Sequence, residues 1–249
     1  MKLYMNVFKN KVIIITGATR GIGLSLVKKF LPVGARLALC SRDTSEFQNH
    51  FETDENIFIK DCYVSNYEDV RSFINQVYKK FGNIDILINN AAIGVFDKIE
   101  NISVEDWNRL ININLNGCFY MCHDTIPLIK KNTSKPKGYI FNIGSISHNF
   151  IVKQNSAYSA SKAATKALSD HLYNELRTED ILVTYMAAGS VNTTFSKRNP
   201  DTIGWKIRPE NIADIVFSTI QTGYNNSQCC TNYLEVKTNS PIQTETFKE

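Results

Sequence analysis

Short apolar runs alternate with longer amphipathic stretches along most of the chain. The runs are too short for buried helices, and the first of them is rich in β-branched residues, so they predict strands. They cover residues 11–16, 36–40, 57–60, 84–88, 138–143, 182–187 and 233–236. Between them, apolar residues recur at helical spacing and predict helices over 22–30, 67–81, 103–127, 156–177 and 211–222. Residues 44–56 and the tail from Lys237 are polar, and we expect one helical turn in the former.

The regular alternation of strands and helices indicates the fold class. Strands joined through helices form a parallel sheet with right-handed crossovers, and helices cover both faces of such a sheet. The sequence contains no repeat and no linker. We therefore predict an α/β fold, a doubly wound parallel sheet of about seven strands in three layers, with residues 1–249 as one domain.

Composition and charge narrow the classes of partner. The chain has 249 residues, of which 43% are hydrophobic and 21% are charged, as in an ordinary soluble globular protein. Its net charge of +4 includes separate lysine pairs, which are typical of solvated helix faces and not of a nucleic-acid stripe. The first residues lack the apolar core of a signal peptide, and no apolar run approaches the length of a membrane span. We expect a cytoplasmic protein without nucleic-acid or membrane partners.

The six cysteines do not have the spacing of a metal site. There is no CxxC pair and no HExxH motif, and the four histidines are scattered. We therefore expect reduced thiols and no metal. Cys118 and Cys122 share a helical face, for which packing in the core is a better explanation than metal binding.

A glycine-rich turn follows the first predicted strand. Gly17, Gly21 and Gly23 have the spacing GxxxGxG, and a helical pattern starts at Ile22. Glycines let the backbone turn tightly and approach a pyrophosphate, and a helix N-terminus offers N–H groups and a positive dipole end. The turn lacks the Lys-Ser/Thr pair of a P-loop, which argues against a nucleoside triphosphatase. The alternative is a strand–helix turn with no ligand.

The tip of the second predicted strand indicates which dinucleotide would bind. NAD-binding proteins of this general type carry an acidic residue about 20 residues beyond the glycines, on the ribose hydroxyls. Here the strand ends at Cys40-Ser41-Arg42. A guanidinium at this position suits a 2′-phosphate, because its fork of donors matches phosphate oxygens, and Arg20 in the glycine turn could assist. The alternative is that Arg42 is a surface residue.

Tyr158 and Lys162 are the main candidates for acid–base chemistry. They stand four residues apart, so a helix would place the phenol beside the ammonium. A neighbouring positive charge lowers the pKa of a phenol, and such a tyrosine can exchange a proton with a substrate oxygen. Ser145 follows the predicted strand 138–143, and its hydroxyl could bond the same oxygen. Taken alone, the pair would more often be an exposed helical pair.

Asparagines mark two further positions. Asn112, Asn114 and Asn116 interrupt a predicted helix, and because asparagine is a mediocre helix former we expect one of them to have a function. Asn90 and Ala91 follow the fourth predicted strand, where small and amide side chains suit a close approach to a cofactor. The alternative for these two is an ordinary Asn-rich turn.

Together, these features resemble the short-chain dehydrogenase/reductase family over nearly the whole chain. The matching residues are Thr16, Gly17, Arg20, Gly21, Ile22, Gly23, Asp61, Asn89, Asn90, Ala91, Asn114, Ser145, Tyr158, Lys162 and the turn 188–193. They occur in the order and spacing of that family, and the set is specific although each motif alone is weak. Within the family, GATRGIG and NIGS are most similar to the 3-oxoacyl-carrier-protein reductase group.

The resemblance implies a Rossmann fold with strand order 3-2-1-4-5-6-7 and hydride transfer between a nicotinamide and a carbonyl carbon. It implies that Tyr158 is the general acid/base, and that Lys162 lowers its pKa and holds the nicotinamide ribose. It also implies that Ser145 polarises the carbonyl and that Asn114 holds a water in a proton relay. Arg20 and Arg42 imply NADP(H). The implied cofactor-binding set is Gly17, Thr19, Arg20, Gly21, Ile22, Gly23, Arg42, Asp61, Cys62, Asn90, Ala91, Tyr158, Lys162, Gly189, Val191 and Thr193.

Departures from the family pattern leave the substrate open. Ala92 and Ala188 stand where the family usually has Gly and Pro, and the segment 195–208 is short for the substrate lid of the carrier-protein reductases. The C-terminus also lacks the Gly-Gly ending of that group. The resemblance therefore implies a small carbonyl or alcohol substrate, free or linked as an acyl thioester, and a homodimer or homotetramer.

Two other functions remain as alternatives. A catalytically silent NADP(H)-binding sensor or scaffold should have lost part of the catalytic set, and all four of its members are present. A sugar-nucleotide epimerase would need a longer chain with a substrate domain. An NADP(H)-dependent oxidoreductase that interconverts a ketone and a secondary alcohol is therefore the main prediction.

Overall fold

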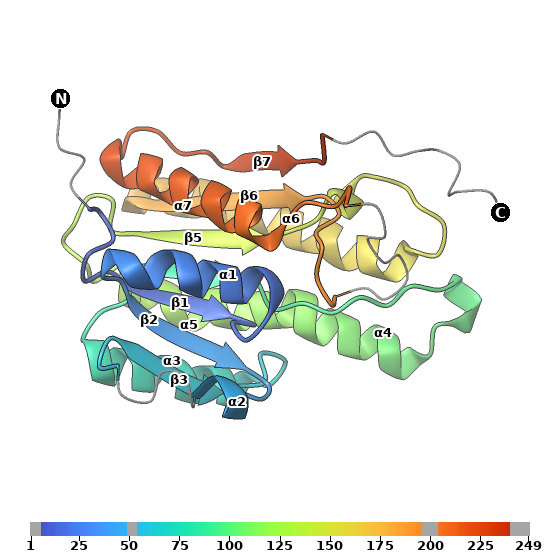
Figure 1. Ribbon diagram of the computed structural model, residues 1–249, viewed down its shortest axis with the longest axis horizontal. Coiled ribbons are helices and arrows are strands. Elements are labelled where there is room, and N and C mark those ends of the chain that lie inside the picture. Colours follow the sequence, from blue (N-terminus) through green and yellow to red (C-terminus); the bar gives the residue numbers. More distant parts are fainter. Residues whose placement is uncertain (1–5, 49–53, 196–203, 240–249) are drawn as a thin grey trace.

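The computed structural model describes residues 6–48, 54–195 and 204–239, and one parallel sheet organises them. Its strands are β1 Val12–Thr16, β2 Arg36–Ser41, β3 Ile57–Asp61, β4 Ile86–Asn89, β5 Gly138–Ile143, β6 Ile181–Ala188 and β7 Tyr233–Val236. Their order in the sheet is β3-β2-β1-β4-β5-β6-β7, and every neighbouring pair is parallel (Figure 1). The predicted doubly wound sheet and its strand order are confirmed.

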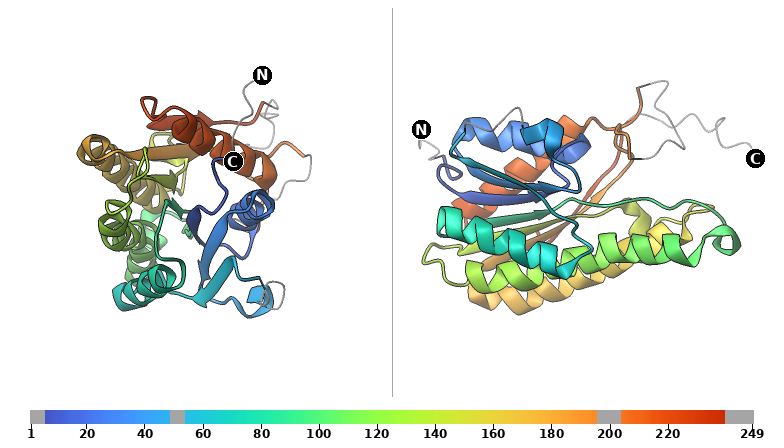
Figure 2. Two further views of the ribbon diagram at one scale, coloured as in Figure 1. Left: turned by 90° about the vertical axis from the view of Figure 1, so that its left-hand side faces the viewer. Right: turned by 90° about the horizontal axis from the view of Figure 1, so that it is seen from below.

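Helices cover both faces of the sheet. They are α1 Gly21–Phe30, α2 Ser45–Gln48, α3 Tyr67–Phe81, α4 Val104–Ile111, α5 Gly117–Ile129, α6 Ser156–Leu176 and α7 Pro209–Asn225. Short 3₁₀ turns lie at Leu31–Val33, Ile99–Asn101, Ile146–His148 and Arg177–Glu179. The helices α1 and α7 pack on one face, and α3, α5 and α6 pack on the other, with the sheet between the two layers (Figure 2). This is the predicted three-layer arrangement.

The central strands are almost entirely apolar because both faces of the sheet are covered. All residues of β1, β4, β5 and β6 are buried. Successive side chains alternate between the two layers, so Ile13 and Ile15 pack with α1 and α7 while Ile14 packs in the core under α3 and α5. A short apolar run was therefore a sufficient sequence signal for each of these strands.

The helix ends follow the capping chemistry that their residues favour. The Ser103 side chain accepts a hydrogen bond from the N–H of Asp106 at 3.0 Å and caps α4. Asn66 caps α3 by accepting from the N–H of Asp69 at 3.1 Å. Gly82 ends α3 with a left-handed φ of 81°, which glycine adopts readily. The predicted end of this helix at residue 81 is confirmed, and α4 begins one residue after the predicted start at 103.

The predicted helix over 103–127 is not one regular helix. A π-helical turn, Asn112–Asn116, separates α4 from α5. Such a turn inserts an extra residue into a helix and is frequently found at functional sites. Asn114 lies in its middle and is 3% exposed. The run of asparagines therefore marks a local change of helix geometry rather than only a weak helix.

Other boundaries differ slightly from the prediction. The strand β4 begins at Ile86, and α7 extends beyond both predicted ends. The helical turn expected within 44–56 is α2. Residues 196–203 of the expected lid and the tail from 240 lie outside the described residues.

A partly buried ion pair lies at the amino ends of the central strands. The Nζ atom of Lys11 lies 2.7 Å from Oδ1 of Asp85, whose side chain is 3% exposed. The second carboxylate oxygen of Asp85 accepts hydrogen bonds from the N–H of Val12 at 2.9 Å and from Nδ2 of Asn83 at 2.7 Å. These contacts join β1 to β4 at the end of the sheet opposite to the strands' carboxyl ends.

Candidate active site

An open cleft of about 1130 Å³ lies at the carboxyl ends of the strands. This is where open α/β sheets bind ligands. Most of the predicted site residues line it, namely Gly17, Thr19, Arg20, Gly21, Ile22, Arg42, Cys62, Asn90, Ala91, Ser145, Tyr158, Lys162, Gly189, Val191 and Thr193. Gly23, Asp61 and Asn114 lie outside this lining. The fold therefore brings together residues that are distributed over most of the sequence.

The glycine turn between β1 and α1 needs its glycines for two different reasons. Gly17 and Gly21 have left-handed φ values of 65° and 54°, which other residues rarely adopt. A Cβ atom on Gly23 would lie 2.1 Å from the carbonyl oxygen of Gly17, so this glycine permits close packing of helix and turn. The N-terminus of α1 opens directly into the cleft, and the side chain at its N-cap, Arg20, makes no capping bond. Unpaired N–H groups and the helix dipole at such an end attract an anionic group.

The tips of β1 and β4 are fastened to each other beside this turn. The Thr16 hydroxyl oxygen accepts from the N–H groups of Asn90 and Ala91, both at 3.0 Å. The Nδ2 atom of Asn90 donates to the carbonyl oxygens of Thr16 at 2.9 Å and Gly17 at 3.1 Å. In this structure the Asn90 side chain therefore holds the glycine turn against β4.

The residues at the tips of β2 and β3 form one end of the cleft. Arg20 and Arg42 are both exposed and line it. Asp61 does not line the cleft, and its Oδ1 accepts hydrogen bonds from the N–H and hydroxyl of Thr44 at 2.8 and 2.7 Å. It thus fixes the loop that follows Arg42. Cys62, the next residue, is buried and does line the cleft.

Tyr158 and Lys162 lie on α6, and both are buried, at 8% and 4% exposure. Burial raises the pKa of Tyr158 to about 12, while a hydrogen bond with the Ser145 hydroxyl acts in the opposite direction. Burial lowers the pKa of Lys162 to about 8. Its Nζ donates to the carbonyl oxygen of Ile143 at 3.2 Å and lies 5.8 Å from the centre of the Tyr158 ring.

This geometry differs from the expectation that Lys162 lowers the pKa of Tyr158. The ammonium of Lys162 is directed to a carbonyl group of β5, and burial has the largest effect on the phenol. Spacing in the sequence predicted that the two residues share a face, but it contained no information on how deeply both are buried.

Asn114 holds the start of the loop after β4. Its Nδ2 donates to the carbonyl oxygen of Ile93 and to the Ser161 hydroxyl, both at 3.0 Å, and its Oδ1 accepts from the N–H of Ile93 at 2.9 Å. A small cavity of about 10 Å³ lies between Asn114, Lys162 and Thr165. This is close to the smallest volume that holds one water molecule.

Aromatic side chains that sequence reasoning missed surround the Tyr158 ring. The ring centre of Phe96 lies 5.3 Å from that of Tyr158, and the ring centre of Phe195 lies 5.7 Å from it. Phe150, Val152 and Phe195 also line the cleft and are 57%, 41% and 39% exposed. Nothing in the sequence separates these residues from ordinary core or surface aromatics, because their role depends on which loops meet at the cleft.

Within residues 6–48, 54–195 and 204–239, no three His, Cys, Asp or Glu side chains gather as metal ligands would. None of the helices in these ranges combines the length and apolar character needed to cross a membrane. All six cysteines are free thiols, and Cys118 and Cys122 are buried as expected.

Comparison with known proteins gives consistent matches. A family model described as short chain dehydrogenase matches residues 11–203. An uncharacterized oxidoreductase of Staphylococcus epidermidis is 32% identical over 223 residues, which are 88% of this chain and 94% of the relative.

Two solved structures illustrate the likeness of fold. An alcohol dehydrogenase from the archaeon Thermococcus sibiricus, complexed with 5-hydroxy-NADP, superposes with a TM-score of 0.83 at 24% identity, covering 93% of this chain and 99% of that one. A 3-ketoacyl-(acyl-carrier-protein) reductase from Brucella melitensis, complexed with NADH, has the same TM-score and identity and covers 92% and 97%.

Proposed function

The chain belongs to the short-chain dehydrogenase family of oxidoreductases, and from this premise we propose that it interconverts a ketone and a secondary alcohol with NADP(H). The observation that carries the proposal is the buried group of Ser145, Tyr158 and Lys162 in the same cleft as the glycine turn. A proton-transferring phenol and an anion-binding turn in one cleft are the two parts that such a reaction needs.

The cleft fits a dinucleotide in both shape and chemistry. A side chain at Gly21 would require a strained φ, and its Cβ would lie 3.1 Å from the Thr193 side chain, so glycine here permits the close approach of Thr193 to the turn. Arg20 and Arg42 would hold a 2′-phosphate, and Lys162 would hold the ribose next to the nicotinamide. When bound, the nicotinamide supplies or accepts the hydride at the carbonyl carbon.

Other parts of the predicted set would hold the remaining portions of the cofactor. Val191 and Thr193 would flank the carboxamide of the nicotinamide. Gly189, which has no side chain, would let the backbone pass close to the cofactor. Asn90 and Ala91 would line the ribose on the adenosine side. Cys62 would meet the adenine from within the cleft. Asp61 does not line the cleft, so it would act on the adenine side only through Thr44 and the loop that it fixes.

The residues around Tyr158 suit proton transfer to a carbonyl oxygen. With a pKa raised by burial, Tyr158 is a neutral donor at pH 7, and Ser145 can donate to the same oxygen. Lys162, whose pKa is lowered to about 8, is mainly protonated at pH 7, so its ammonium could donate hydrogen bonds to the ribose and to a water. One water in the cavity beside Asn114 would link Lys162 to Asn114 and supply the next proton.

The wall of the cleft supports an apolar substrate. Phe96 and Phe195 pack against Tyr158, and Phe150 and Val152 expose further apolar surface to the same cleft. Burial of this surface by a ligand would be favourable. We therefore propose a carbonyl compound with apolar substituents, free or linked as an acyl thioester.

The function can be tested with Tyr158→Phe. We expect NADPH-dependent turnover of a panel of ketones to fall by about 10²–10⁴-fold, because a general acid contributes a factor of this size. NADPH binding, followed by its fluorescence, should be unchanged. Tyr173→Phe, a partly buried tyrosine on the same helix, is the matched control. A variant that keeps more than about a tenth of the wild-type kcat would contradict a sole acid/base. NADPH binding by the wild type without turnover of any ketone would favour the sensor instead.

We also propose that the protein forms a homodimer or homotetramer through the helices next to Asn114 and Tyr158, which are α5 and α6. Phe119 on α5 is 47% exposed, and its ring centre lies 5.8 Å from that of Tyr120 and 5.7 Å from that of His123. Exposed aromatic clusters of this kind often mark an interface. Light scattering of the purified protein would show the assembly, and a monomer at micromolar concentration would contradict it.

A further inference from the structure

Tyr185 connects two of the proposed catalytic residues from behind the cleft. It lies in the middle of β6 and is 0% exposed. We propose that Tyr185 is a positioning residue whose hydroxyl fixes the backbone of Ser145 relative to that of Lys162. This inference rests on the proposed function, because a fixed distance between Ser145 and Lys162 matters for turnover only if both residues take part in the reaction.

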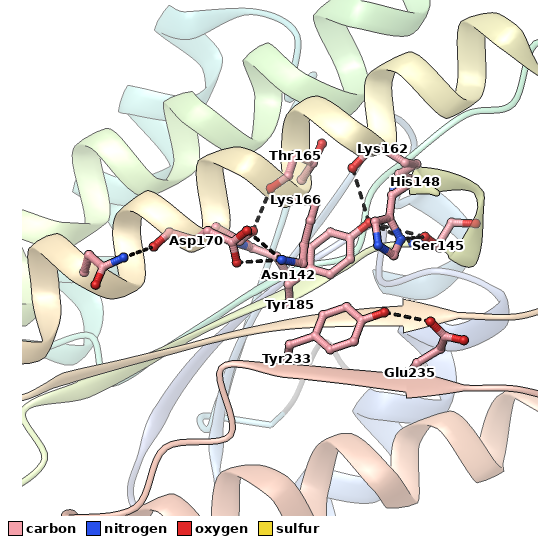
Figure 3. A network of polar contacts seen from close by, with 12 residues as sticks. Asn142, Ser145, His148, Lys162, Thr165, Lys166, Asp170, Tyr185, Tyr233 and Glu235 are labelled. Carbon is pink, nitrogen blue, oxygen red and sulfur yellow. Dashed lines mark hydrogen bonds and ion pairs between the residues drawn. The ribbon is translucent and has the colours of Figure 1, made fainter. Parts of the chain in front are cut away.

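The Tyr185 hydroxyl contacts three backbone groups of these two residues. Its oxygen accepts a hydrogen bond from the N–H of Ser145 at 3.2 Å. It also lies 3.4 Å from the carbonyl oxygen of Ser145 and 3.3 Å from that of Lys162, and it can donate its single hydrogen to either (Figure 3). One phenol therefore joins the segment that follows β5 to the second turn of α6.

The contacts matter because Ser145 and Lys162 belong to different elements. Ser145 follows β5, whereas Lys162 lies on α6, beyond the loop that bears Phe150 and Val152. Loops of this kind are the more mobile parts of a fold. A buried hydrogen bond that spans the loop limits how far the Ser145 hydroxyl can move relative to the ammonium of Lys162.

The chain provides space for the Tyr185 ring at Gly144. A Cβ atom on Gly144 would lie 2.0 Å from Cζ and 2.3 Å from the hydroxyl oxygen of Tyr185. Gly144 does not have a positive φ, so close packing and not backbone freedom accounts for this glycine. The residue before the proposed catalytic serine is therefore small because a tyrosine from β6 occupies its side-chain position.

Two further rings fix the orientation of Tyr185. The Tyr233 ring of β7 stacks on it, with centres 6.3 Å apart and an angle of 6° between the planes. The His148 ring meets it edge-on, with centres 5.6 Å apart at 74°. Nδ1 of His148 lies 2.9 Å from the carbonyl oxygen of Ser145, so this histidine holds the same backbone position.

Burial keeps the Tyr185 phenol neutral, although a lysine lies nearby. The ammonium of Lys166 lies 5.9 Å from the centre of the Tyr185 ring and is paired with the carboxylate of Asp170 at 2.6 Å. Burial raises the pKa of Tyr185, and its hydrogen bond with the Ser145 backbone opposes this only in part. The hydroxyl therefore remains a hydrogen-bond donor over the whole working range of pH.

The experiment compares Tyr185→Phe with Tyr139→Phe. Tyr139 is a buried tyrosine of β5 whose hydroxyl lies 2.7 Å from that of Thr184, so both variants lose one buried phenolic hydroxyl and keep the ring. For Tyr185→Phe we expect kcat to fall by about 2- to 10-fold, as for loss of a neutral hydrogen bond, with an unchanged KM for NADPH and a displaced pH profile of kcat. Tyr139→Phe should keep the wild-type kcat and pH profile.

A second measurement reads the contact directly. Hydrogen exchange of the Ser145 N–H should be faster in Tyr185→Phe and unchanged in Tyr139→Phe. Equal kcat, equal pH profiles and equal Ser145 exchange in the two variants would overturn the proposal. If the wild type reduces no ketone, or if Tyr158→Phe remains active, the proposed function fails. Unchanged exchange of the Ser145 N–H in Tyr185→Phe would overturn the positioning role even then.

Discussion

The buried ammonium of Lys162 should lower the free energy of unfolding of the protein. Burial lowers the pKa of this group from 10.5 to about 8. At 1.36 kcal/mol per pKa unit, the difference corresponds to about 3 kcal/mol of destabilisation by the charged form at pH 7. Between about pH 8 and pH 10.5 the unfolded chain holds a proton on this group that the folded chain has lost, so stability rises with pH in this window.

The substitution Lys162→Met removes this charge and keeps an unbranched side chain of similar length. The hydrogen bond from Nζ to the carbonyl oxygen of Ile143 is lost as well, which costs about 1 kcal/mol. We therefore expect Lys162→Met to be more stable than the wild type by about 2 kcal/mol at pH 7, although its turnover is lost. As the pH rises toward 10.5 the gain should disappear and turn into a loss of up to about 1 kcal/mol, because only the lost hydrogen bond then remains.

The assay is urea unfolding of both proteins without cofactor at several pH values between 7 and 10.5. Lys166→Met is the matched control, because Lys166 lies one turn further along α6 and its ammonium is paired with Asp170 near the surface. This control should lose less than about 1 kcal/mol and show no gain at pH 7. A destabilised Lys162→Met at pH 7, or a difference from wild type that does not change with pH, would refute the reasoning.

Two further predictions concern what the cleft accepts. Arg42 stands where a carboxylate would repel a 2′-phosphate, so kcat/KM for NADPH should exceed that for NADH by at least about tenfold. The substitution Arg42→Asp should reverse this order. Equal efficiencies in the wild type would show that Arg42 does not contact the cofactor. Phe96→Ala should raise KM for an apolar ketone about tenfold or more, because a buried aromatic contact is lost. Phe58→Ala, which lies outside the cleft, should leave this KM unchanged. The same KM in both variants would contradict an apolar substrate site.

Much of the fold could be predicted from the sequence because each signal was local. A buried parallel strand needs only a short apolar run, and the alternation of runs and amphipathic stretches defines the three layers. The π-helical turn could not be predicted, because it accompanies a contact of the Asn114 amide with Ile93, 21 residues earlier in the chain. The run of asparagines indicated an irregular helix at this position, but the contact of Asn114 with Ile93 is known only from the three-dimensional structure.

The parts of the candidate site that could be predicted consist of characteristic residue types placed close together in the sequence. The glycine turn and the Tyr158–Lys162 pair are of this kind. Tyr185 is not, since in sequence it resembles any aromatic residue of a buried strand. Its place beside Ser145 results from the pairing of β5 with β6, in which Asn142 lies opposite Tyr185. The pKa of Tyr158 also escaped prediction, because burial depends on the whole fold.

At the opposite end of the sheet, Lys11 differs from Lys162 because its ammonium is paired with a carboxylate. Its partner Asp85 is buried and also accepts from the N–H of Val12 and from Asn83. Asp85→Ala would leave an ammonium and a buried N–H without these contacts, so we expect a loss of about 3–5 kcal/mol in urea unfolding. The kcat per folded molecule should not change, since the cleft lies at the other ends of the strands. A loss below about 1 kcal/mol would show that water replaces the carboxylate, as it does for exposed pairs. A reduced kcat in fully folded protein would show instead that the two ends of the sheet are coupled.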